Sequence, residues 1–260
     1  MNKKKQIYYT REYRHMKNTP LSSIGKIFFT LIPFYVIILI CYSDFSLWLS
    51  RMAGKILSGI YGVKVGIGKN NSLAPLMPVY HVKLDGRKPG FTVCLLVFIV
   101  TLILLLVTLQ IFEKYKSFMI YISIFLGILL VSDAYFIIWG KRFPYTLGNY
   151  ADIYMLQQVI MWLAIALVTV VALSLLPGIH GSSLLAFWSI MCYSMVYDSI
   201  RYIIFLVVLY ASTNVLMAPL YFMCGVYLDF MYVVAIYSIY VKNISEKFNK
   251  REEMKVWEWS

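Results

Sequence analysis

Residues 91–112 of the chain read FTVCLLVFIVTLILLLVTLQIF, and no charged residue lies between Lys88 and Glu113. About 20 consecutive apolar residues cross a bilayer as a helix. Five further apolar stretches of at least this length are found at 27–49, 118–140, 153–176, 184–210 and 215–241. We therefore predict an all-α polytopic membrane protein with six transmembrane helices. The boundary between the last two spans depends on Ser212-Thr213-Asn214 and Pro219.

Composition and charge agree with this class. The 260 residues are 61% hydrophobic and only 14% charged, whereas soluble domains carry about 25% charged residues. The net charge of +12 comes from basic residues at the ends and in the loops, which favours anionic membrane lipids over nucleic acid as a partner. We expect a multi-pass protein of the cell (plasma) membrane that does not bind nucleic acid.

Basic residues also predict the topology. Seven lie before residue 27 and five after residue 241, so the positive-inside rule places both termini in the cytoplasm. The expected organisation is a cytoplasmic basic tail (1–26), a six-helix transmembrane domain (27–241) and a cytoplasmic tail (242–260). The outer loop at 50–90 also contains seven basic residues, which opposes this assignment but does not reverse it.

The outer loop begins with an amphipathic pattern. Between residues 48 and 61 two apolar residues alternate with two polar ones, as expected for a helix with one apolar face. Such a helix beside a span is typical of the membrane interface. The residues we expect to mark this interfacial helix are Trp48, Arg51, Met52, Lys55 and Ile56.

Two alternating runs follow, at 63–68 and 80–85. Alternation with a period of two indicates half-buried strands, so a small β-hairpin is predicted. A lone hairpin is marginal in water. It must rest on the interfacial helix, on the membrane surface or on another protein, and it is either a self-contained cap or an edge for a partner strand. The candidate contacts for a partner or polymer are Tyr80, His81, Lys83, Arg87 and Lys88.

Five charged residues fall inside the predicted spans: Asp44, Asp133, Asp198, Arg201 and Asp229. A charge at the centre of a bilayer costs about 2.5–3.5 kcal/mol on insertion scales, so such charges normally face a partner or water. Asp44 and Asp133 lie nearer to span ends, where we expect at least partial solvation.

The other three charges form a candidate cluster. Asp198 and Arg201 are three residues apart and share a helical face. Asp198 lies 15 residues before Thr213, and Asp229 lies 16 residues after it. In a helical hairpin the two acids are level, and the fork of Arg201 can bridge them. An interhelical clamp, an ion, proton or substrate pathway, and a contact with another membrane subunit are the alternatives.

No complete catalytic or cofactor motif is present. The four cysteines form no C-x-x-C pair, and the three histidines are far apart with no zinc-ligand spacing. We therefore predict no enzyme activity, no metal and no cofactor. An enzyme whose site assembles only in space, with Cys94 as a nucleophile, is the alternative.

From about Leu47 to Leu176 the order of features resembles the exosortase/archaeosortase family of membrane transpeptidases. Ala53-Gly54 through Gly68 and Tyr80-His81-Val82-Lys83-Leu84 are similar to that family's Gly-rich outer segment with short strands. Lys88-Pro89-Gly90 stands in place of the family's Cys-Ser-Gly, and Ser132-Asp133-Ala134-Tyr135 in place of its Asn-x-x-Arg. No histidine lies between Lys141 and Gln158. The resemblance implies a scaffold without the family's chemistry, so no catalytic residue is carried over.

Together these patterns favour a non-catalytic accessory subunit. The expected partner is a larger membrane enzyme, a glycosyltransferase that synthesises and exports a cell-surface polysaccharide, since some exosortase-like proteins accompany such enzymes. The alternative is a transporter or permease subunit with a polar site in the membrane.

Overall fold

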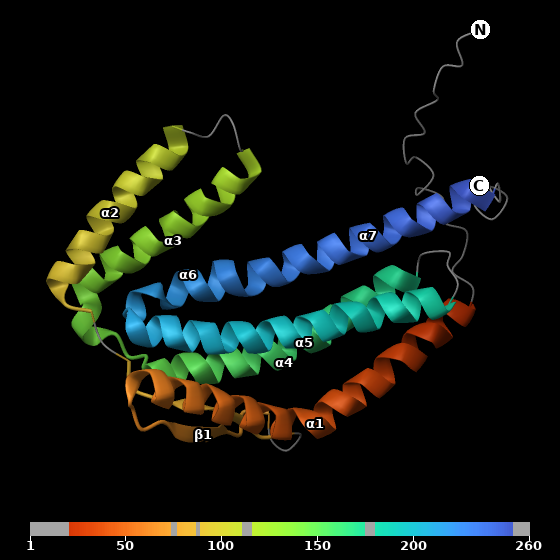
Figure 1. Cartoon of the computed structure of the whole chain (residues 1–260), viewed down its shortest axis with the longest axis horizontal. Helices are drawn as coiled ribbons and strands as arrows, with labels where there is room; N and C mark the ends of the chain where they lie inside the picture. The colour runs from red at the N-terminus through yellow and green to blue at the C-terminus, as the bar shows by residue number, and fades with distance from the viewer. Residues whose placement is uncertain (1–20, 74–76, 87–88, 111–115, 175–179, 252–260) are drawn as a thin grey trace, which may run out of the picture.

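The structure is a computed structural model, and it describes residues 21–73, 77–86, 89–110, 116–174 and 180–251. Six helices in this part of the chain are long and apolar enough to cross a membrane. The prediction of an all-α polytopic fold is confirmed. Figure 1 shows that the helices run along one another and that α1 begins and α7 ends at the same end of the bundle. The cytoplasmic location of that end stays a prediction.

The first five spans are single helices. Their bounds are Leu21–Tyr61 (α1), Phe91–Gln110 (α2), Lys116–Trp139 (α3), Leu147–Ser174 (α4) and His180–Ala211 (α5). The predicted bounds agree within six residues except at the end of α1. A short 3₁₀ helix, Gly140–Arg142 (η2), follows α3.

The predicted separate interfacial helix is wrong as a separate element, because α1 continues without a break through residues 48–61. Its buried residues keep the helical spacing from the span into this segment: Tyr42, Ser46, Leu49, Ala53 and Leu57. The helix ends at Tyr61, and the next residue is Gly62, whose φ of 66° is readily adopted only by glycine. At 1.5 Å per residue, 41 residues extend about 60 Å, twice the hydrocarbon thickness of about 30 Å.

The sixth span is segmented. It consists of Asn214–Leu216 (η3, 3₁₀), Met217–Tyr221 (α6), Phe222–Tyr227 (η4, π-helical) and Leu228–Arg251 (α7). The predicted break at residues 212–214 is confirmed. Helix α7 continues beyond 241 into the segment that we expected to be a tail.

The predicted β-hairpin is confirmed with shifted bounds. Strands Gly66–Asn70 (β1) and Val79–Lys83 (β2) pair antiparallel, with Ile67 opposite Val82. Strand β2 packs against α1 and α4, so the hairpin rests on the helices of the same chain. The edge of β2 that faces away from β1 forms hydrogen bonds with side chains of the helices. The Tyr80 N–H donates to Ser46 Oγ (3.1 Å), Ser50 Oγ donates to the Tyr80 carbonyl (3.1 Å), and the Val82 N–H donates to Tyr202 Oη (3.1 Å).

The main core lies between α1, α4 and α5, with β2 at one end. Its largest fully buried side chains include Phe34, Tyr42, Trp162, Phe187 and Tyr202. Helices α2 and α3 pair with each other and diverge from this core (Figure 1). The α3 helix is joined to the sixth span by Ser132 Oγ, which donates to the Val215 carbonyl (2.8 Å), and by Tyr121 Oη, which donates to the Met223 carbonyl (3.1 Å).

Candidate functional site

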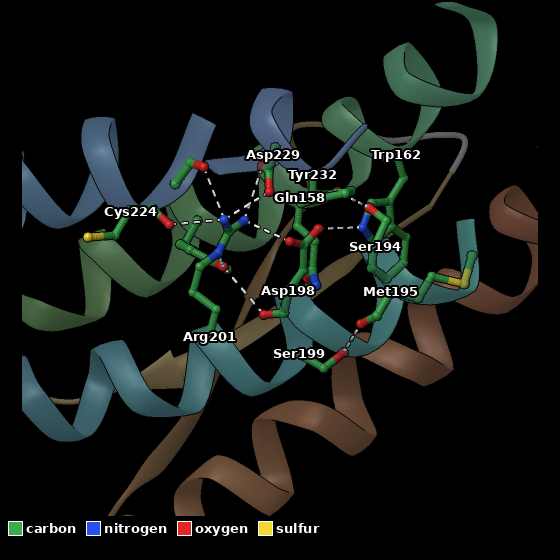
Figure 2. Close-up of polar contacts among 12 residues, drawn as sticks. Gln158, Trp162, Ser194, Met195, Asp198, Ser199, Arg201, Cys224, Asp229 and Tyr232 are labelled. Atoms are coloured by element: carbon green, nitrogen blue, oxygen red, sulfur yellow. Dashed lines mark hydrogen bonds and ion pairs between the residues drawn. The ribbon is translucent and has the colours of Figure 1, made fainter. Parts of the chain in front are cut away.

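The structure brings together the three charged residues of the predicted cluster (Figure 2). Arg201 Nη2 lies 2.7 Å from Asp198 Oδ1, within α5. Arg201 Nη1 lies 2.8 Å from Asp229 Oδ1, in the first turn of α7, and Nη2 donates to Asp229 Oδ2 at 3.1 Å. All three side chains are buried. The geometry is the bridge of two carboxylates by one guanidinium that the residue spacing predicts.

Arg201 also donates hydrogen bonds to a tyrosine hydroxyl and to two backbone carbonyls. Its Nε donates to Tyr154 Oη at 2.7 Å, and its Nη1 donates to the carbonyls of Cys224 and Gly225 at 3.0 Å each. A guanidinium has five N–H donors, and Arg201 makes five hydrogen bonds within the chain. No donor is left for a further ligand.

The two carbonyls are available because the sixth span is irregular at this point. Gly225 has φ −94° and ψ −106°, outside the helical region, within the π-helical segment η4. An irregular turn removes carbonyls from the usual helical ladder, and a membrane offers no water to satisfy them. Arg201 donates to both carbonyls, and at Gly225 it adds to the backbone N–H of Leu228, so it stabilises the kink as well as the two carboxylates.

Asp198 has a second partner from α4. Trp162 Nε1 donates to Asp198 Oδ2 at 2.6 Å, and Tyr154 Oη donates to the Asp198 carbonyl at 3.3 Å. Tyr154 and Trp162 were not among the predicted site residues. With Gln158 they recur every four residues and therefore share one face of α4. That spacing was the available signal.

Further hydroxyl contacts join the spans. Tyr42 Oη of α1 donates to the Met155 carbonyl of α4 at 2.6 Å, and Tyr232 Oη of α7 donates to Ser194 Oγ of α5 at 2.6 Å. The Tyr197 ring lies 5.3 Å from the Arg201 guanidinium carbon. Several tyrosines of this protein thus connect helices to one another.

A second polar cluster lies at the hairpin. Asp152 of α4 accepts hydrogen bonds from Asn70 Nδ2 at 2.7 Å, and its Oδ1 lies 3.2 Å from His81 Nδ1. Sequence reasoning missed Asp152 because the fourth span was predicted to begin one residue later. The cluster fixes both strands to α4.

His81 was expected to contact a partner or polymer, but its side chain is only 13% exposed. Its ring covers Gly68 so closely that a Cβ added there would clash with Nε2. Burial lowers the pKa of His81, with a smaller contribution in the same direction from Lys83, while the Asp152 carboxylate raises it. The imidazole therefore favours its neutral form more than a free histidine does.

The other predicted outer-loop residues are distributed differently. Lys83 is exposed and Tyr80 is half-buried, while Arg87 and Lys88 lie outside the described residues. In the C-terminal part of α1, Ile56 is half-buried and the other four predicted residues are exposed: Trp48, Arg51, Met52 and Lys55. Ser50 and Gly54, which belong to the polar half of the predicted pattern, are buried. The face that packs inward therefore includes positions from both the apolar and the polar half of the predicted pattern.

The expected partial solvation of Asp133 is wrong. Asp133 is 0% exposed, and neither carboxyl oxygen has a hydrogen-bond partner among the described residues. It shares a face of α3 with Leu129 and Phe136, two residues of a small apolar cluster that also contains Cys94 of α2. The prediction of partial solvation used only the closeness of Asp133 to the end of its span near Lys141. Which face of the helix carries the side chain decides its exposure, and this face of α3 points inward.

Within the described ranges no group of three or more His, Cys, Asp or Glu side chains could hold a metal ion. Comparisons with protein-family models, with curated proteins and with solved structures found no match to this chain.

Proposed function

We propose that this protein is a non-catalytic accessory subunit of a complex in the cell membrane. Its partner is a glycosyltransferase that synthesises and exports a cell-surface polysaccharide. The observation that carries the proposal is that Arg201 uses all five N–H donors on groups of the chain itself. A centre saturated in this way holds helices together and has no donor for a substrate.

Two further features support an assembly role. The α2–α3 pair presents apolar side chains along most of its length, and only 11% of the α2 span is buried. The resemblance of residues 47–176 to exosortase-like proteins, without the family's signature residues, supports a scaffold that accompanies an envelope enzyme.

The test is co-purification of the chromosomally tagged protein, together with measurement of envelope polysaccharide in a deletion strain. The proposal expects a glycosyltransferase in the purified complex and a loss of polymer on deletion. Isolation of a stable monomer, with polymer output unchanged by deletion, would refute it.

A transporter or permease subunit is the second candidate, favoured by the π-helical segment next to Asp229. Transporters place substrate and ion sites at such interrupted helices. Asp198→Asn and Asp229→Asn separate the two functions, since both keep the side-chain shape. Loss of flux with intact assembly supports transport, whereas loss of assembly supports the clamp.

A further inference from the structure

The hairpin has one edge that is closed and one that is open. The hydrogen bonds to Ser46, Ser50 and Tyr202 show that backbone groups of Tyr80 and Val82 point away from β1. In an antiparallel pair the residue opposite such a position also points its N–H and C=O outward. The partners in register are Lys69 and Ile67.

The outward groups of β1 have no partner within the described chain. No hydrogen bond joins the backbone of Ile67 or Lys69 to any other described residue outside the strand pairing. Ile67 is 42% exposed, and Lys69 and Gly66 are also exposed. An exposed strand edge of this kind is a template for another strand.

Charge at this edge selects the partner. Lys64, Lys69 and Lys83 are all exposed beside β1, and the nearby carboxylate of Asp152 is engaged by Asn70 and His81. A second copy of the chain pairing through β1 would bring lysines together, which is destabilising. An extended segment with acidic side chains would instead pair its charges with these lysines.

We propose that the free edge of β1 binds an extended, acidic segment of a partner protein by strand addition. Main-chain hydrogen bonds to Ile67 and Lys69 supply the binding, and the three lysines select acidic over basic segments. The inference rests on the proposed accessory function for its biological role. It assigns the main-chain contact to β1, and of the β2 side chains predicted from the sequence it uses only Lys83.

The experiment measures binding of a fluorescent peptide to the full chain in nanodiscs of uncharged lipid. The probe is a short synthetic peptide in which valine alternates with glutamate, and its counterpart has lysine in place of glutamate. We expect the acidic probe to bind, with an affinity that falls as salt is raised, and the basic one not to bind. Equal binding of both peptides, binding of neither, or self-association through β1 would overturn the proposal.

Two variants locate the site. Ile67→Pro removes an outward N–H, a substitution that edge strands tolerate, and should weaken binding about tenfold. Lys69→Glu should weaken binding of the acidic probe by about tenfold or more without removing a backbone donor. Lys55→Glu is the matched control, because it makes the same charge change on the exposed side of α1.

Retained hydrogen-exchange protection of β2 checks that the hairpin is intact in each variant. Wild-type affinity in Ile67→Pro and Lys69→Glu would overturn the proposal. If the peptide fails to bind while the tagged protein still co-purifies with a glycosyltransferase, the accessory function stands and uses another surface.

Discussion

Asp198 and Asp133 are both fully buried aspartates in apolar helices, but their surroundings differ. Asp198 accepts hydrogen bonds from Arg201 and Trp162. Asp133 has none among the described residues. Asp198 lies where side-chain hydrogen bonds join α4, α5 and α7, whereas Asp133 lies beside an apolar cluster that includes Cys94 of α2 and Leu129 and Phe136 of α3. Burial of a carboxyl group therefore does not identify its role, and the number of donors that reach it does.

Removal of Arg201 should have the largest effect. Arg201→Leu removes the cation that lies between two buried carboxylates, and it removes the side-chain donor to the carbonyls of Cys224 and Gly225. Breaking a buried ion pair on one side costs about 3–5 kcal/mol. Denaturant-induced unfolding in detergent should show a loss of this size.

The matched control for Arg201→Leu combines it with Asp198→Asn and Asp229→Asn. Because no buried charge is then left unpaired, this triple variant should recover much of the lost stability. Equal stability of Arg201→Leu and the wild type would mean that the cluster does not clamp the helices.

Trp162→Phe should have the next largest effect. The ring is retained, but Asp198 Oδ2 loses the indole donor at 2.6 Å. A hydrogen bond to a charged group contributes about 1.5–3 kcal/mol, and the same unfolding experiment should register that loss. Trp188→Phe, on the partly exposed side of α5, is the control and should change stability by about 0.5 kcal/mol or less. Equal losses in both variants would show that packing, and not the donor, is responsible.

Replacement of Asp133 should change the stability in the opposite direction, toward a more stable protein. An unsatisfied buried polar group costs about 1–3 kcal/mol, and an apolar residue of similar shape removes that cost. Asp133→Leu should therefore stabilise the protein by this amount, whereas Asp198→Leu should destabilise it. A loss of stability in Asp133→Leu would show that a partner outside the described residues pairs with Asp133 in the native protein.

The sequence was sufficient for the spans and for the contact of Arg201 with two acids, because helical rise and residue spacing determine both. It was insufficient where tertiary structure decides. The Cys224 and Gly225 carbonyls accept from Arg201 only when the kinked sixth span packs against α5. The burial of Asp133 could be predicted only with knowledge of which face of α3 turns inward. No local pattern distinguished a separate interfacial helix from an extension of α1.

The hairpin cluster should produce the smallest effect, and one that depends on pH. Burial lowers the pKa of His81 in the folded protein. In the unfolded chain the pKa of this histidine is about 6.5, so His81 is protonated at a higher pH in the unfolded chain than in the folded protein. The contribution of neutral His81 to the free energy of unfolding is therefore fully present above about pH 6.5, and it is lost as the pH falls toward the lower pKa of the folded state. The melting temperature of the wild type should decrease by a few degrees more than that of His81→Gln over this interval. The opposite order would mean that attraction between protonated His81 and Asp152 outweighs the cost of burying the charge, and that acid tightens the attachment of the hairpin to α4.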